Sequence, residues 1–258
     1  MLDWAILTSH FHADTLNFTL QTSNWRLPVK IEVLENSDLV AKKAAQVIAA
    51  EARDAVVARG RFTMAVSGGH TPWQMLRELA GEKIPWEEVH VFQVDERVAP
   101  PKDPDRNITH LDKSLLTRVP LGPAQFHAMP VESPDLRTAA KNYARTLQEI
   151  AGSPAVLDLV HLGLGPDGHT ASLVPGDPVL DVTDADVALT GPYQWRCRMT
   201  LTYPIINRAR RILWVVTGSD KAGPLLRLRE RDRAIPAGRV NQDHATVLAD
   251  REAAASLS

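Results

Sequence analysis

The chain has 258 residues and a formal net charge of −2, because 31 Asp and Glu residues slightly outnumber 29 Lys and Arg residues. This balance gives no electrostatic reason to expect nucleic acid or a membrane as the main partner, and no apolar run approaches the ~18 residues of a membrane span. The lone Cys197 excludes an intrachain disulfide framework and a CxxC zinc site. We therefore expect a cytoplasmic protein that acts on a small molecule.

Residues 1–28 show no sustained period and lack the basic start and apolar stretch of a signal peptide, so we interpret them as an N-terminal leader. Within them, His10, His12 and Asp14 resemble the start of the His-x-His-x-Asp-His zinc loop of metallo-β-lactamase-like hydrolases. Thr15 stands where the last histidine of that loop should be. We therefore predict no metal site.

Alternating strand-like and helix-like segments follow the leader. Helical periodicity predicts helices at 37–59, 73–80 and 135–151, the first capped by Asn36 or Ser37 and ended by Gly60. Short, almost wholly apolar runs predict strands at 29–34, 62–67, 89–94, 156–165, 211–216 and 245–248. Apolar strands that alternate with helices are typical of a parallel sheet with helices on both faces. We predict one Rossmann-like α/β domain over 29–258, with its ligand at the carboxyl ends of the strands.

The turn after the second predicted strand reads "SGGHTP". Gly68 and Gly69 allow a tight turn with an open backbone, Thr71 can cap a helix, and Pro72 suits its first position. Amides at such a helix start can bind phosphate, although an ordinary strand-to-helix turn uses the same residues. Neither nucleotide-binding glycine pattern is present.

After the third strand, Asp95, Glu96 and Arg97 form either a ligand-binding group or a solvated charge cluster in a loop.

The segment "GLGPDGHTASLVPG" follows the strand at 156–165 and holds Asp167 and His169 one residue apart among glycines. Histidine can take a proton near neutral pH, and a neighbouring carboxylate can orient its ring. Alternatively, Asp167 and Thr170 merely cap a turn and leave His169 on the surface.

Further along the chain, three cationic residues can bind a phosphate or lie on the surface: Arg196, Arg198 and Lys221.

Taken together, these segments resemble the 6-phosphogluconolactonase family over roughly residues 30–250. The resemblance rests on "SGGHTP", "VDER", Asn107, "GLGPDGHTASLVPG", Arg198 before "MTLTYPIINRA", and "VTGSDKA", in that order. It implies a sugar-phosphate isomerase-like parallel α/β fold, which the family shares with glucosamine-6-phosphate deaminases. The deaminase loop ends in Asn-Glu-Pro-Gly, whereas Leu173 and Val174 precede Pro175 here. The carboxylate that deaminase chemistry uses is therefore absent.

Two features depart from the family pattern. His70 stands in the glycine loop where Ser is usual, so an imidazole or backbone amides replace a hydroxyl as a possible phosphate contact. The leader has no counterpart in the family. Neither departure affects the loop that holds Asp167 and His169.

The resemblance implies hydrolysis of 6-phospho-D-glucono-1,5-lactone to 6-phosphogluconate, in the oxidative pentose phosphate pathway, without a cofactor. His169 would be the general base, Asp167 would hold its ring, and Arg97 or nearby amides would stabilise the oxyanion. Asn107 would contact the sugar, and the phosphate would bind Gly68, Gly69, His70, Thr71, Arg198 and Lys221. The alternatives are a deaminase or isomerase of a sugar phosphate, and a sugar-phosphate sensor without catalysis. The chain acts as a monomer or a homodimer, a choice that the sequence leaves open.

Overall fold

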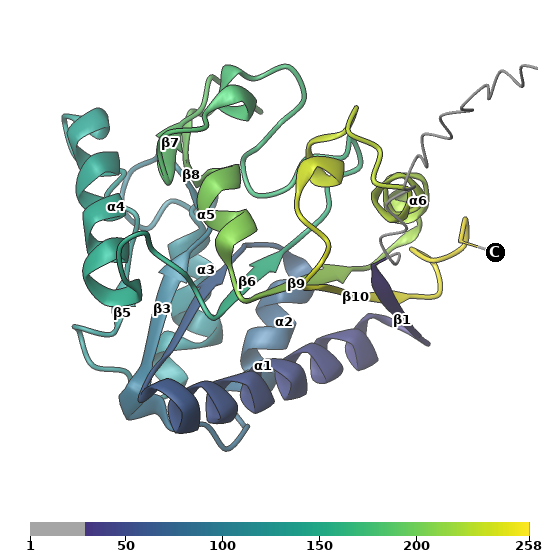
Figure 1. The fold of residues 1–258 in the computed structure, drawn as a ribbon, viewed down its shortest axis with the longest axis horizontal. Helices are drawn as coiled ribbons and strands as arrows, with labels where there is room; N and C mark the ends of the chain where they lie inside the picture. The colour runs from purple at the N-terminus through teal and green to yellow at the C-terminus, as the bar shows by residue number, and fades with distance from the viewer. Residues whose placement is uncertain (1–28, 258) are drawn as a thin grey trace, which may run out of the picture.

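The computed structural model describes residues 29–257. Its centre is a seven-stranded parallel sheet in the order β1-β10-β9-β6-β2-β3-β5 (Figure 1). The strands are β1 (Lys30–Leu34), β2 (Phe62–Val66), β3 (Val89–Gln93), β5 (Phe126–His127), β6 (Leu159–Leu162), β9 (Arg211–Val216) and β10 (Ala245–Asp250). The predicted leader, with His10, His12 and Asp14, lies outside the described residues.

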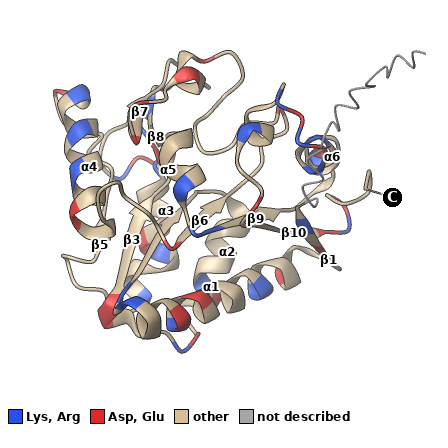
Figure 2. Cartoon of the chain, viewed as in Figure 1, with Lys and Arg blue, Asp and Glu red and all other residues tan. Residues whose placement is uncertain are grey.

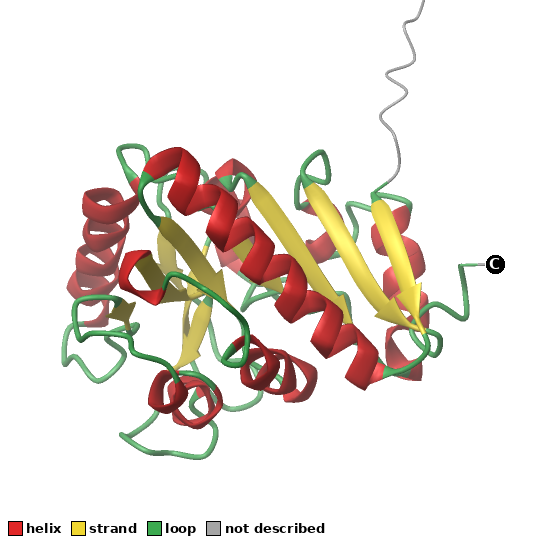
Figure 3. Cartoon of the chain, turned by 90° about the horizontal axis from the view of Figure 1, so that it is seen from below, coloured by secondary structure: helices red, strands yellow, loops and turns green. Residues whose placement is uncertain are grey.

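Helices cover both faces of this sheet, as the alternation of segments predicts (Figures 1 and 3). One face carries α1 (Ser37–Arg59), α2 (His70–Leu79) and α3 (Asn107–Ser114). The other carries α4 (Leu136–Ala151), α5 (Tyr203–Arg208) and α6 (Ala222–Arg229). Figure 2 shows both signs of charge on α1 and α4. Among the described helices, none is both long and apolar enough to cross a bilayer.

The predicted caps of α1 are confirmed in detail. The side chain of Asn36 accepts a hydrogen bond from the backbone N–H of Leu39 at 3.0 Å, which satisfies one of the unpaired amides of the first turn. At the other end, Gly60 adopts the left-handed conformation with φ of 73°. The local sequence therefore fixed the limits of this long helix.

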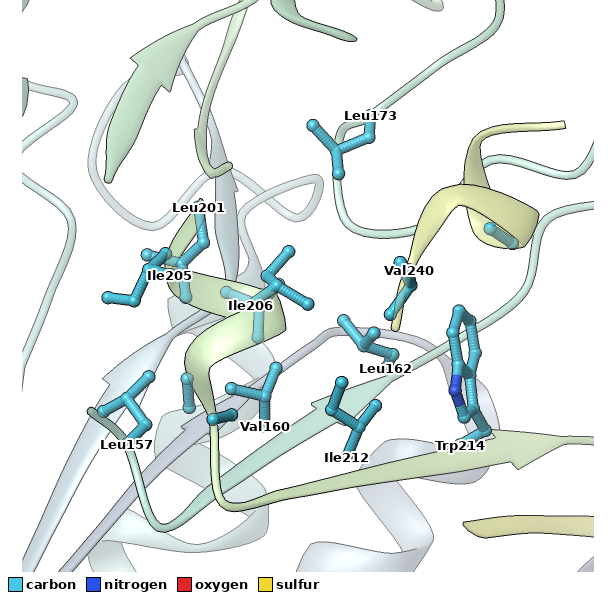
Figure 4. Packing of buried hydrophobic residues seen from close by; sticks show 14 of the residues in the cluster. Leu157, Val160, Leu162, Leu173, Leu201, Ile205, Ile206, Ile212, Trp214 and Val240 are labelled. Atoms are coloured by element: carbon cyan, nitrogen blue, oxygen red, sulfur yellow. The ribbon is translucent and has the colours of Figure 1, made fainter. Parts of the chain in front are cut away.

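Each face of the sheet has its own apolar core. On the side of α1, eight residues of that helix are buried, six of them alanines, so α1 lies close to the strands. On the other side, Leu162 and Trp214 pack with Ile206 of α5 and Val240 (Figure 4). Because neighbours such as Met64 and Ala65 belong to opposite cores, the strands have apolar residues on both faces.

A second, three-stranded antiparallel sheet has no counterpart in the sequence prediction. Its strands are β4 (Asp95–Arg97), β8 (Arg198–Leu201) and β7 (Val187–Leu189), in the order β4-β8-β7. The interpretation of Asp95, Glu96 and Arg97 as a solvated loop cluster is wrong, because they form an edge strand and Glu96 is fully buried. A three-residue strand that pairs with one a hundred residues away carries no local period, so the sequence gives no sign of it.

Candidate active site

The candidate site lies at the point in the main sheet where the order of the strands reverses. From β2 the chain continues outward through β3 to β5, and it then returns to β6 on the other side of β2. The loops after β2 and β6 therefore diverge beyond the carboxyl ends of two adjacent strands, which is where open parallel sheets bind ligands. A pocket of about 350 Å³ occupies this position.

This pocket gathers almost every residue that the sequence singles out. Its lining includes Gly68, Gly69, His70, Thr71, Arg97, Asn107, His169, Arg198 and Lys221. Asp167 is not part of the lining, and it reaches the pocket through His169. Among residues 29–257, no group of three potential metal ligands comes together.

His169 and Asp167 form a hydrogen-bonded pair. The Nδ1 atom of His169 lies 2.6 Å from Oδ1 of Asp167, and the backbone N–H of His169 donates to the same oxygen at 3.1 Å. Because an ionised carboxylate only accepts hydrogen bonds, Nδ1 carries the proton in a neutral ring, and Nε2 keeps a free lone pair. The loop therefore both forms a tight turn and leaves one ring nitrogen able to accept a proton.

The electrostatic setting keeps Asp167 ionised. Partial burial acts to raise the pKa of Asp167, but hydrogen bonds from the His169 backbone, the attraction to the His169 ring and hydrogen bonds from the His169 and Tyr193 side chains together lower it. The Tyr193 hydroxyl donates to Oδ2 at 3.1 Å. A carboxylate with a lowered pKa remains an acceptor at neutral pH, which is what the orientation of the imidazole requires.

The glycine loop sits against Asn107 with no room for a side chain. A Cβ atom on Gly68 would lie 2.0 Å from Oδ1 of Asn107. Gly69 is the N-cap of α2 with φ of 131°, so the helix starts at His70 and not after Thr71. The expected cap at Thr71 is wrong: its hydroxyl lies 2.6 Å from that of Thr217, at the end of β9. The amide-rich turn therefore opens into the pocket and is tied to a neighbouring strand end.

Arg97 is held at the pocket wall by its neighbours. Its Nη1 donates to Oδ1 of Asn107 at 2.7 Å and to the backbone oxygen of Asp105 at 2.8 Å. The Asn107 amide nitrogen in turn donates to Asp95. Both ends of the Asn107 side chain are thus bonded to protein groups, and this residue fixes the guanidinium of Arg97.

Glu96 lies beneath these residues and has no signal in the sequence beyond its place in "VDER". The buried carboxylate accepts hydrogen bonds from the backbone N–H groups of Arg97, Asn107 and Ile108, at 2.8 to 2.9 Å, and lies 3.3 Å from the buried Arg106. These donors satisfy the oxygens of the buried carboxylate, so it is not left without hydrogen-bond partners. It therefore anchors β4 and the start of α3, and with them the two pocket residues.

Arg198 stands beside Arg97, because the two residues are direct partners in the β4–β8 ladder. Burial lowers the pKa of Arg198, Asp95 opposes that shift, and the charge of Arg97 adds to it. The Nε atoms of both arginines are buried and have no hydrogen-bond partner among the described residues. Two adjacent cations with unpaired donors favour an anion between them. Lys221, in the 3-10 turn Ser219–Lys221 that follows β9, adds a third cation and pairs with Asp220 at 2.6 Å.

The comparisons with known proteins identify the family of this chain. A doubly wound α/β sheet with a cationic pocket at the reversal of strand order is the general plan of a phosphate-ligand enzyme. The family model for glucosamine-6-phosphate isomerases/6-phosphogluconolactonase matches residues 35–249, so the chain belongs to this family. The resemblance inferred from the motifs is confirmed.

Individual relatives refine the comparison. A 6-phosphogluconolactonase from Synechocystis sp. is 37% identical over 196 residues, which cover 74% of this chain and 81% of that protein. A solved 6-phosphogluconolactonase from Thermotoga maritima is similar with a TM-score of 0.77 and 26% identity, covering 86% of this chain and 98% of that one. A monomeric glucosamine-6-phosphate deaminase has a TM-score of 0.76 at 18% identity, over 88% of this chain and 99% of that one. The fold is thus common to both activities, and the site must separate them.

Proposed function

We propose that this protein hydrolyses 6-phospho-D-glucono-1,5-lactone to 6-phospho-D-gluconate, a reaction of the oxidative pentose phosphate pathway. One observation carries the proposal: His169, held by Asp167 with Nε2 of the imidazole free to accept a proton, lines the same pocket as the Arg97–Arg198 pair. A base and an anion site in one pocket suit a phosphorylated substrate that reacts with water. Relatives that carry the name 6-phosphogluconolactonase support the same activity.

In the proposed reaction, His169 takes a proton from a water molecule as its oxygen attacks the lactone carbonyl carbon. The carbonyl oxygen becomes negatively charged, and the carbon–oxygen double bond then re-forms as the bond from this carbon to the ring oxygen breaks. The carboxylic acid that results loses its proton to water. The leaving ring oxygen takes the proton from the imidazolium and becomes a hydroxyl group. Asp167 holds the ring in position and stabilises the imidazolium throughout.

Cationic side chains and backbone amides stabilise the oxyanion and bind the phosphate. We assign stabilisation of the oxyanion to Arg97 or to loop amides, since such donors act strongly where water is excluded. The phosphate is held by the loop Gly68–Gly69–His70–Thr71, by Arg198 and by Lys221. Asn107 positions Arg97 through its Oδ1, in addition to the predicted contact with the sugar. All of these steps use side chains and amides of this chain.

The alternatives fit the same pocket less well. Leu173 and Val174 occupy the place of the deaminase Asn-Glu pair and both are buried, Leu173 within the apolar core, so this loop offers no carboxylate for ring opening. A sensor that only binds the ligand would not need the bonded Asp167–His169 pair. We interpret residues 29–258 as a single domain. The lone Cys197 supports a reducing, cytoplasmic location.

The test generates the lactone in place from glucose 6-phosphate with its dehydrogenase and follows its disappearance with and without this protein. We expect acceleration over spontaneous hydrolysis, and its absence would rule out the proposal. His169→Ala should lower kcat by roughly 10²–10⁴-fold with little change in KM. Asp167→Asn should have a smaller effect, because the imidazole remains but is poorly oriented. If both variants instead lose thermal stability and ligand binding together, the pair is structural.

A further inference from the structure

Tyr193 touches the catalytic pair from outside the pocket lining. Its hydroxyl lies 3.1 Å from Oδ2 of Asp167 and 3.5 Å from Nδ1 of His169. Its ring meets the imidazole edge-on, with centroids 5.4 Å apart. We propose that Tyr193 is a positioning residue for the proposed lactonase reaction, which locks the Asp167 carboxylate and thereby the tautomer and angle of His169.

The hydrogen-bond pattern gives this residue a specific task. His169 supplies two donors to Oδ1 of Asp167, so Oδ2 receives no hydrogen bond from this residue and needs a separate donor to be held. The Tyr193 hydroxyl must donate, because the carboxylate only accepts. Burial and the neighbouring Asp167 charge raise the pKa of Tyr193, so the phenol keeps its proton. With both oxygens occupied, Asp167 has one orientation.

The hairpin that carries Tyr193 is itself anchored. Tyr193 and Arg196 exchange backbone hydrogen bonds, and the two residues between them, Gln194 and Trp195, both have positive φ, at 51° and 68°. This is the conformation of a tight two-residue hairpin turn, which neither side chain favours. Arg196 then pairs with two carboxylates of the loop between β4 and α3, Asp103 and Asp105, at 2.9 and 3.0 Å.

The same tyrosine also supports the proposed phosphate clamp. The guanidinium carbon of Arg198 lies 5.0 Å from the centre of the Tyr193 ring, within the range of a cation–π interaction. The Arg198 Nη2 donates to Gln194 at 3.2 Å. Tyr193 therefore connects two parts of the site: its hydroxyl acts on the base, and its ring acts on the cation.

The separate roles of the Tyr193 hydroxyl and the Tyr193 ring can be tested with two different substitutions. Tyr193→Phe keeps the ring and removes only the hydroxyl, so we expect kcat to fall about tenfold or more while KM stays within about twofold, because a hydrogen bond to a charged group is lost. Tyr193→Leu removes the ring as well, and it should also raise KM for the phosphorylated lactone. Tyr143→Phe is the matched control, because its buried hydroxyl bonds Gln93 and His127 away from the pocket. It should lower thermal stability and leave kcat unchanged.

A second measurement reports on the mechanism itself. In protein labelled with ¹⁵N-histidine, we expect His169 of the wild type in the Nδ1–H tautomer and that of folded Tyr193→Phe in a mixture of tautomers. Full kcat and an unchanged tautomer in Tyr193→Phe would overturn the inference while the wild type remains an active lactonase. Inactivity of the wild type would instead remove the proposed function on which the inference rests.

Discussion

Gly165→Ala should disable the proposed base, His169, without removing any of the proposed catalytic groups. A Cβ atom on Gly165 would lie 2.1 Å from Nδ1 of His169 and 2.2 Å from Cε1. Ordinary contact begins at 3.4 Å, so the ring must retreat by about 1.3 Å, which breaks its hydrogen bond to Asp167. Since a misplacement of about 1 Å can cost about 10²-fold in rate, we expect kcat to fall by that order.

The assay is lactone hydrolysis at saturating substrate, with melting temperature measured on the same preparations. Gly223→Ala serves as the control, because a Cβ atom at this position in α6 meets nothing within 4 Å. Alanine there should leave kcat unchanged. A folded Gly165→Ala protein with near-normal kcat would refute the claim that the ring must hold its place beside Asp167.

Three further predictions concern binding and stability. Gly68→Ala places a Cβ atom 2.0 Å from Oδ1 of Asn107, and it should raise KM roughly tenfold by displacing that side chain; an unchanged KM would contradict this. Arg198→Ala and Lys221→Ala should each raise KM and reduce the preference for phosphorylated over unphosphorylated lactone, a preference that persists if these cations do not bind phosphate. Burial lowers the pKa of His161 from 6.5 to about 3. Because the unfolded chain therefore binds a proton on this histidine more readily than the folded protein does, the free energy of unfolding should fall by about 2 kcal/mol between pH 7 and pH 5, measured by denaturant titration. His161→Asn keeps an acceptor for the Ser67 amide but cannot titrate, so the dependence of the free energy of unfolding on pH should be weaker in this variant. An equal pH dependence in both proteins would show that His161 does not contribute.

Much of the architecture can be predicted from local sequence. The strand at 211–216 has exactly its predicted limits, and Asn36 and Gly60 cap the first long helix as expected. Apolar strands that alternate with helices imply the parallel sheet, because only burial on both faces favours such composition. The predicted limits of a strand are too wide where apolar residues continue beyond the hydrogen-bonded part of the sheet. The strand predicted at 156–165, for example, pairs with its neighbours only over Leu159–Leu162.

The short second sheet and its consequences could not be predicted in this way. Tyr193 shows no periodic or motif signal, yet it lies 3.1 Å from a carboxylate 26 residues earlier in the chain. Glu96 is an ordinary charged residue in sequence, and its burial depends on amides that α3 supplies. Such roles arise from contacts between distant segments, whose partners no local pattern encodes.

The sequence by itself determined the chemical groups of the site and the sheet edge at which they gather. Residue types near strand ends, such as Gly68 and the Asp167–His169 pair, carry that information because parallel strands bring their carboxyl ends to one edge. Only the tertiary structure decided how these groups face one another. The register that pairs Arg97 with Arg198, and the hydrogen bond that leaves Nε2 of His169 free, depend on long-range packing, because side-chain orientation is set by contacts between elements and not by the order of residues.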